Sequence, residues 1–464
     1  MKAEFGIVGL GTMGGALLQN MVDHGFHVAG YDLNQDKADA LNKIEGIAAT
    51  TDVEKFVDSI RAPRAIMLLV PAGPPVDSAI QAMLPHLKKG DFLLDGGNSY
   101  FKDTSRREKE LREAGYGFMG MGVSGGEAGA RNGPSMMPGG TQENYDRVKD
   151  VLEAIAAKYE GQPCVALMGA GAAGHYVKMV HNGIEYAMMQ LIAEAYDLMK
   201  RSMEMSNEEI AAKFKSWDEG SLGGYLVEIT SVVLSAKDAD SKACLVDMIS
   251  DKAKAKGTGK WTSQDAMDLG IAVPMIDAAV NAREMSALKD ERVAAAKRFP
   301  NDPKMDLGGK EAALAYVPRA LLAAFLLAYD QGLTQIRAAS EEYGFGTDLS
   351  AATAVWRAGC IIRSKLLGPI HDAVAAQPDL PNLLMAEKFD VEIEGLLGAL
   401  RSMVTNMINH GIPVPAFSAA LAYFDTYRSA QLPSNLIQGQ RDLFGAHTYE
   451  RTDKPGTFHT HWEE

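Results

Sequence analysis

In the first part of the chain, short apolar runs alternate with amphipathic stretches. The apolar runs are bounded by turn residues, which predicts buried strands at residues 4–8, 26–31, 65–70 and 92–94. Between and after them, apolar residues recur with a period near 3.6, which predicts helices over 16–22, 76–88 and 144–159. This alternation is typical of a doubly wound α/β sheet. The Gly/Ala run at 169–174 is the predicted joint to a second domain.

Beyond residue 175 the periodicity is almost entirely helical. The predicted helices cover 185–200, 207–215, 311–339, 387–410 and 415–429. Ala-Tyr-Asp triplets at 195–197 and 328–330 each precede a tryptophan, which indicates a duplicated helical unit. Glycines and prolines after residue 430 predict a poorly helical tail. We therefore expect an α/β Rossmann-like domain at 1–174, a large all-α domain at 175–430 and a C-terminal tail at 431–464.

Composition narrows the function. A chain of 464 residues, 47% hydrophobic and 23% charged, is long enough for two or three domains with a large core. It shows no apolar run of transmembrane length and no signal-peptide pattern at its start. Its three cysteines indicate neither a disulfide framework nor a zinc cluster, and they fit a reducing cytoplasm. A net charge of −14 argues against nucleic acid or an anionic membrane as partner, so an anionic ligand needs a local cluster of basic residues.

A glycine-rich turn lies between the first strand and the first helix. It reads Gly9-Leu10-Gly11-Thr12-Met13-Gly14, a spacing that lets backbone N–H groups approach a pyrophosphate. Asp32 follows the second strand, where a carboxylate can bind both ribose hydroxyls. Because this carboxylate repels a 2′-phosphate, we expect NAD as the cofactor. Lys37, one turn into the next helix, could instead pair with that phosphate and favour NADP.

The stretch 174–186 carries the most specific chemistry. In a helix, Lys178, His181, Asn182 and Glu185 lie at i, i+3, i+4 and i+7 and share one face. Taken alone, the pattern also fits a solvated polar stripe. Upstream, two turns offer polar groups to a hydroxylated or anionic ligand: Asn98 after the strand at 92–94, and Ser124-Gly125-Gly126 as an anion nest. An Asx-turn and a plain glycine-rich loop are the competing explanations.

Five further motifs occur in a fixed order and, with the glycine-rich turn, span essentially the whole chain. They are Leu94-Asp95-Gly96-Gly97-Asn98-Ser99, Gly122-Val123-Ser124-Gly125-Gly126, His175-Tyr176-Val177-Lys178-Met179-Val180-His181-Asn182-Gly183-Ile184-Glu185-Tyr186, Lys256-Gly257-Thr258-Gly259-Lys260-Trp261 and Arg441-Asp442-Leu443-Phe444-Gly445-Ala446-His447-Thr448-Tyr449-Glu450. In these motifs the chain resembles the decarboxylating 6-phosphogluconate dehydrogenase family. The resemblance implies oxidation of 6-phospho-D-gluconate at C3 and loss of CO2 to give D-ribulose 5-phosphate, in the pentose phosphate pathway or gluconate utilization.

The resemblance also implies residue roles. Lys178 is the expected base, which must bind substrate neutral with a pKa near 8, and Glu185 is the expected acid. Residues implied to hold the substrate are Asn98, Ser124, Gly125, Gly126, His181, Asn182, Tyr186, Lys256, Thr258, Arg283, Arg441 and His447. Residues implied to hold the cofactor are Gly9, Leu10, Gly11, Thr12, Met13, Gly14, Asp32, Val70, Pro71, Ala72 and Asn98. No metal is expected, because decarboxylation of a β-keto acid needs only a stabilised enolate.

Departures from the family pattern bear mainly on the cofactor. Asp32-Leu33-Asn34 stands where NADP-dependent members carry Asn-Arg-Thr, which supports NAD. Pro71 replaces a common lysine, and Lys254 and Ala255 replace a small residue and an amide. The resemblance further implies a homodimer with shared active sites, in some cases a dimer of dimers, whose tail reaches the neighbouring subunit, with the second helical unit serving packing and dimerisation.

Two other functions stay open at this point. One is a short-chain β-hydroxyacid dehydrogenase of the same wider superfamily, which would share the glycine-rich turn. The other is a cofactor-binding protein without catalysis, although it would have no reason to keep both Lys178 and Glu185.

Overall fold

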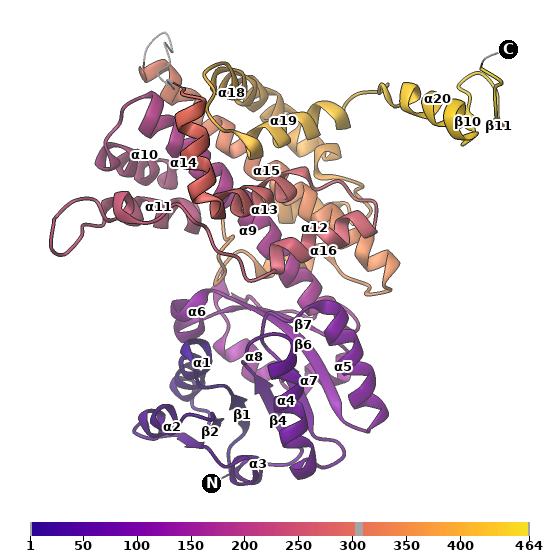
Figure 1. The fold of residues 1–464 in the computed structure, drawn as a ribbon. Coiled ribbons are helices and arrows are strands. Elements are labelled where there is room, and N and C mark those ends of the chain that lie inside the picture. The colour runs from indigo at the N-terminus through magenta and orange to yellow at the C-terminus, as the bar shows by residue number, and fades with distance from the viewer. Residues whose placement is uncertain (1, 302–309, 463–464) are drawn as a thin grey trace.

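The computed structural model describes residues 2–301 and 310–462, so residue 1 of the predicted first domain and residues 463–464 of the predicted tail lie outside it. The chain forms an α/β body, a helical body stacked on it, and a tail that extends away from the helical body (Figure 1). Helix α9 (Ala173–Asp197) runs from the first body into the second. The predicted order of fold classes along the chain is confirmed.

The first body is built on a seven-stranded sheet of order β3-β2-β1-β4-β5-β6-β7. Its strands are parallel except β7, which runs antiparallel to β6. The strands are β1 (Phe5–Val8), β2 (Val28–Tyr31), β3 (Ile47–Thr50), β4 (Ala65–Leu68), β5 (Phe92–Asp95), β6 (Gly117–Ser124) and β7 (Ser135–Gly139). Helices cover both faces: α1 (Thr12–Asp23), α2 (Gln35–Leu41), α3 (Val53–Ser59), α4 (Pro74–Met83), α5 (Phe101–Glu113), α6 (Gly126–Asn132), α7 (Gln142–Asp146) and α8 (Lys149–Ile155).

Successive strand residues enter two separate cores, as the period of two requires. Ile7 and Met67 belong to the core on one face of the sheet, and their neighbours Val8 and Leu68 belong to the core on the other. A sheet buried on both faces explains why the strands read as continuous apolar runs instead of alternating ones.

The second body is helical, with α9 and α15 packed against each other at its centre. Its other helices are α10 (Asn207–Glu219), α11 (Tyr225–Ser235), α12 (Thr258–Asp268), α13 (Pro274–Ala287), α14 (Lys289–Arg298), α16 (Leu349–Val355), α17 (Leu367–Ala376), α18 (Asp390–Asn409) and α19 (Pro415–Tyr427). Helix α15 spans Lys310–Glu342. The two Ala-Tyr-Asp triplets lie on α9 and α15, but duplication of the unit stays a prediction.

Two predicted elements are wrong. The helix expected over 144–159 is split into α7 and α8, and Lys158–Tyr159 (β8) pairs with Gln162–Pro163 (β9). The intervening Glu160 and Gly161 both have positive φ, which suits a tight hairpin turn. The tail, expected to be poorly helical, contains α20 (Ser434–Gly445), followed by the short strands β10 (Tyr449–Glu450) and β11 (Thr457–Phe458).

The joint between the bodies is a backbone contact. Helix α9 packs against β6 and β7 at its first turn. A Cβ on Gly174 would lie 2.3 Å from the carbonyl oxygen of Met137 and 2.5 Å from that of Gly120. Only glycine allows this approach, so α9 is fixed against the sheet before it enters the helical body.

Candidate functional site

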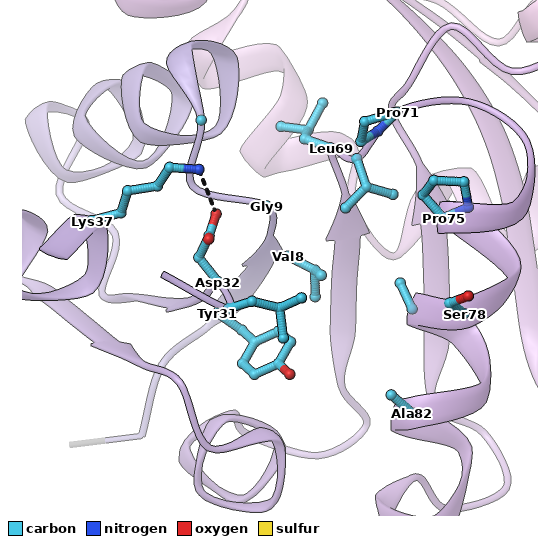
Figure 2. Close-up of a pocket in the computed structure, with 14 residues that line it drawn as sticks. Val8, Gly9, Tyr31, Asp32, Lys37, Leu69, Pro71, Pro75, Ser78 and Ala82 are labelled. Carbon is cyan, nitrogen blue, oxygen red and sulfur yellow. Dashed lines mark hydrogen bonds and ion pairs between the residues drawn. The ribbon is translucent and has the colours of Figure 1, made fainter. Parts of the chain in front are cut away.

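A cavity of about 650 Å³ opens at the carboxyl ends of β1, β2 and β4 (Figure 2). Strands β2 and β4 flank β1, so the sheet order reverses direction there, where α/β sheets bind ligands. Five predicted cofactor residues line the cavity: Gly9, Gly11, Asp32, Val70 and Pro71. The other predicted cofactor residues, Leu10, Thr12, Met13, Gly14, Ala72 and Asn98, do not line this cavity. Apolar walls from α4 and β1 suit a flat aromatic base.

Asp32 is held at the end of β2 by three hydrogen bonds. The backbone N–H groups of Leu10 (2.7 Å) and Asn34 (2.9 Å) donate to its carboxylate, and so does Lys37 Nζ (3.2 Å). Figure 2 shows the Lys37 side chain reaching across to Asp32. Burial alone would raise the pKa of Asp32, but these hydrogen bonds outweigh it and hold the pKa below its usual value. The cavity therefore presents a fixed negative charge with a lysine beside it.

On α9, the polar face predicted from the sequence points into the protein. Lys178 is 5% exposed and His181 is fully buried. The His181 ring links three neighbours: its Nδ1 lies 3.3 Å from Lys178 Nζ and 3.0 Å from Asn182 Oδ1, and its Nε2 lies 3.2 Å from Ser124 Oγ. Glu185 Oε2 lies 4.0 Å from the same Nδ1. The solvated-stripe alternative is therefore wrong, since these side chains form one connected and largely buried cluster.

Burial sets the protonation of this cluster. It lowers the pKa of Lys178 to about 8, although the Glu185 charge opposes the shift. Burial also raises the pKa of Glu185, against the opposing effect of Lys178 and Arg283, and it lowers the pKa of His181 well below its usual value. A lysine that can be neutral near physiological pH and a carboxyl group that holds its proton more tightly than usual are suited to act as base and acid.

The approach of Lys178 to the sheet depends on Gly122 in β6. A Cβ at position 122 would lie 2.2 Å from the Cβ of Lys178. Strand β6 then ends at Ser124, and Gly125 and Gly126 turn the chain into α6. The predicted nest therefore lies directly beside the base, joined to it through His181.

Helix α12 brings the lysine-glycine motif to the same cluster. Its first residue, Thr258, is buried and accepts a hydrogen bond from Asn182 Nδ2 at 3.1 Å. The far half of α12 is anchored by buried Asp265, which accepts hydrogen bonds from the hydroxyls of Tyr176 (2.7 Å) and Tyr343 (2.9 Å). Lys256, just before the helix, is exposed. Helix α12 is therefore fixed by buried contacts, while Lys256 in front of it stays accessible from solvent.

Arg283 on α13 completes the basic side of the site. Its guanidinium carbon lies 3.4 Å from the centre of the Tyr186 ring, and Nη1 donates to the backbone carbonyl of Lys254 at 3.3 Å. Stacking on the ring orients the guanidinium and leaves other donors available to an anion. Tyr186, Thr258 and Arg283 thus gather around the polar face of α9.

The remaining predicted residues differ in placement. Asn98 is exposed just after β5, and its turn is held by Asp95, which accepts from the Gly97 N–H at 3.0 Å and the Ser99 hydroxyl at 2.6 Å. The Asx-turn is therefore made by Asp95, which leaves the Asn98 amide for other partners. Arg441 and His447 lie on the extended tail, and the single chain does not bring them to the α9 cluster.

The segment that follows α16 also reaches the site, which the sequence did not predict. The Ile361 N–H donates to Ser124 Oγ at 3.5 Å, the Ser135 N–H donates to the Gly359 carbonyl at 2.9 Å, and Trp356 packs edge-on against His181. We expected this second helical unit to serve packing and dimerisation, yet it supplies one wall of the site. Its Trp-Arg-Ala-Gly sequence was the available signal.

Neither a metal cluster nor a membrane span is found in the described ranges. Within 2–301 and 310–462, no three His, Cys, Asp or Glu side chains are grouped so that they could hold a metal ion. In the same ranges, no helix combines the length and hydropathy needed to cross a membrane.

Comparison with known proteins gives consistent matches over the whole chain. The family model described as the NAD binding domain of 6-phosphogluconate dehydrogenase matches residues 4–203, and that of the 6-phosphogluconate dehydrogenase C-terminal domain matches residues 174–462. The two matches overlap at residues 174–203, which hold nearly all of α9 and the short π-helix Leu198–Ser202 that follows it.

Individual proteins agree with these models. The chain is 48% identical over 465 residues to the NADP(+)-dependent, decarboxylating 6-phosphogluconate dehydrogenase of Bacillus subtilis (strain 168), covering 99% of both chains. It is equally identical to the decarboxylating enzyme of Escherichia coli (strain K12), again over 99% of both. Among solved structures, Plasmodium falciparum 6-phosphogluconate dehydrogenase, described in apo form and in complex with NADP+ and with 6-phosphogluconate, superposes with a TM-score of 0.95. It is 40% identical, with 99% of this chain and 100% of that chain covered.

Proposed function

This chain belongs to the 6-phosphogluconate dehydrogenase family, and from that premise we propose that it converts 6-phospho-D-gluconate to D-ribulose 5-phosphate and CO2. The observation that carries the proposal is the buried Lys178, which has a pKa of about 8. It lies beside the Ser124 nest and on the same face of α9 as Glu185. Burying an ammonium is costly, so a buried lysine whose pKa is lowered in this way is a candidate for a catalytic group.

The residues present fit a nicotinamide cofactor. The cavity at the ends of β1, β2 and β4 offers apolar walls for the base, and Asp32 lines it, where its carboxylate would accept from the ribose hydroxyls. When bound, the nicotinamide accepts the hydride that leaves C3 of the substrate.

The chain's own groups handle the protons. Neutral Lys178 takes the proton of the 3-hydroxyl as C3 becomes a ketone. The β-keto acid then loses its carboxylate as CO2, and the Lys178 ammonium stabilises the enolate oxygen left behind. Glu185, two helical turns along α9, donates a proton to the carbon that becomes C1 of the product. His181 and Asn182 orient the hydroxyls between the two catalytic groups.

The preferred cofactor in this proposal is NAD. A free 2′-hydroxyl can donate to the Asp32 carboxylate, whereas a 2′-phosphate would be repelled by it. The neighbouring residue is Leu33, so an arginine that could pair with a phosphate is not present at that position. The Bacillus subtilis relative is named as NADP(+)-dependent, and Lys37 is the residue through which this chain could share that preference.

The test is kcat/KM for 6-phosphogluconate oxidation with NAD and with NADP, accompanied by CO2 release. Wild type should prefer NAD. In D32S, the ratio of kcat/KM with NAD to kcat/KM with NADP should fall at least tenfold. K37A should leave the NAD reaction within about twofold, with K43A, an exposed lysine nearby, as the matched control. A wild-type preference for NADP, reduced by K37A alone, would overturn the role of Asp32. NADH formation without CO2 would indicate a β-hydroxyacid dehydrogenase instead.

We also propose that the active protein is a homodimer, or a dimer of such dimers, in which the tail of each chain completes the partner's site with Arg441 and His447. The tail exposes large apolar side chains that a partner surface would cover: Leu436, Ile437, Leu443 and Phe444. Coexpression of K178M and R441A chains tests this. A shared site would recover up to half of the wild-type activity in the mixed dimer, because one of its two sites keeps both residues. If each tail serves its own chain, no site is complete and no activity returns.

A further inference from the structure

Asp442 is the one buried residue among the described residues of the tail, 431–462. Its carboxylate accepts four hydrogen bonds. The donors are the Thr448 N–H (2.9 Å), His459 Nδ1 (2.9 Å), the Thr460 N–H (3.0 Å) and Trp462 Nε1 (2.9 Å). These donors come from both sides of the β10–β11 hairpin, so one carboxylate joins α20 to residues 459–462.

The turn that follows α20 is held by the same network. Ala446 and Thr448, on either side of His447, both have positive φ, a conformation that costs side-chain-bearing residues energy and persists only where neighbours enforce it. Thr448 is fixed at both ends, because its N–H donates to Asp442 and its carbonyl accepts from Gln438 Nε2 at 2.5 Å. His447 therefore cannot change its place without breaking bonds at Thr448.

Arg441 is tied to this turn through Gln438. Its Nη1 donates to Gln438 Oε1 at 2.9 Å, and the same amide group holds the Thr448 carbonyl. Arg441 and His447 are both exposed, on a tail that stands clear of the rest of the chain (Figure 1). The two side chains are thus arranged relative to each other before any partner is present.

We infer that Asp442 is a positioning residue for the substrate: it sets Arg441 and His447 as one preformed unit that enters the partner's site. This rests on the proposed function and on the proposed tail exchange. Preformed groups bind with less loss of conformational entropy, so the benefit falls on substrate affinity. The reacting C3 and the nicotinamide are handled by α9 and the first body, so the chemical step does not pass through Asp442.

D442N is the informative variant, since it keeps the shape of the side chain but replaces one acceptor oxygen with a donor that faces N–H groups. The KM for 6-phosphogluconate should rise roughly tenfold or more, with kcat within about twofold and the KM for NAD unchanged. Q438A, which loosens the same turn from its other end, should raise the same KM by a smaller factor. D453N removes an exposed tail carboxylate paired with Arg451 and should change neither constant.

A double-mutant cycle separates positioning from general damage. In an R441A/H447A background, D442N should add less than a twofold further change, because the groups it positions are gone. Light scattering should show that D442N keeps the wild-type oligomeric state. A wild-type KM in D442N, or an equal increase in both backgrounds, would overturn the inference. Absence of 6-phosphogluconate turnover in the wild type would instead overturn the proposed function.

Discussion

Replacing Lys178 with methionine should abolish turnover and, at neutral pH, stabilise the protein. Burial lowers the pKa of this lysine from 10.5 to about 8. A shift of that size corresponds to about 3 kcal/mol of unfavourable free energy in the folded state while the lysine is protonated. Methionine fills a similar volume without a charge, so K178M removes this term.

The stability gained by K178M should depend on pH, because Lys178 loses its proton at a lower pH in the folded protein than in the unfolded chain. Between about pH 8 and 10.5 the unfolded chain keeps the Lys178 proton and the folded protein does not, so wild-type stability rises with pH in that window. Below pH 8 both states are protonated and the penalty is present in full. The advantage of K178M over wild type should therefore be about 2–3 kcal/mol larger at pH 7 than at pH 10.

Urea unfolding at pH 7 and pH 10, at one fixed protein concentration, measures this difference. The substitution also changes the packing free energy, but this contribution is the same at both pH values and cancels when they are compared. Repeating the pair in an E185Q background removes the titration of the neighbouring carboxyl group, and K213M, an exposed lysine on α10, is the matched control. Wild-type kcat/KM should rise with pH up to about 8. A K178M advantage equal at both pH values, with a flat wild-type profile from pH 6 to 9, would refute the assignment of Lys178 as a buried base.

Three further predictions follow from other sites. E185Q should lower kcat about a hundredfold or more, with a small change in the KM for 6-phosphogluconate, because the enediol loses its proton donor; steady-state kinetics measures this. Burial raises the pKa of Glu194 to about 7, while its carboxylate accepts from two N–H groups at the start of α19. Wild type should therefore lose up to about 3 kcal/mol of stability as the pH rises from 4.5 to 7, and E194Q should not. Urea unfolding midpoints across that range measure the difference. G174A should lower stability by several kcal/mol, because its Cβ would meet the Met137 carbonyl, whereas G398A on open α18 should not, as thermal unfolding would show.

The sequence predicted secondary structure best where the local pattern of apolar residues alone determines the element. The strands predicted from apolar runs lie close to their observed bounds. The same holds for the helices predicted from periodicity, α10, α15, α18 and α19. Helix α20 was missed, because its glycines and the prolines around it suggest a loop. Its stability depends on bonds that Asp442 receives from residues up to 20 positions away, which local composition does not reveal.

The candidate site divides in the same way. The shared face of Lys178, His181, Asn182 and Glu185 follows from helical spacing alone. The contact of His181 with Ser124 spans 57 positions, and that of Ser124 with Ile361 spans 237. Such pairs depend on how the two bodies stack, so the wall formed by the segment after α16 could only be found in three dimensions.

The close contact of Gly174 with the sheet has a mechanical consequence. Lys178 lies on α9, the helix that connects the two bodies, four residues after Gly174. Bending between the bodies would carry Lys178 along with the sheet, so the distance between Lys178 and the cavity at the ends of β1, β2 and β4 would be preserved. Substrate entry then does not require the jaw-like opening that many two-domain enzymes use.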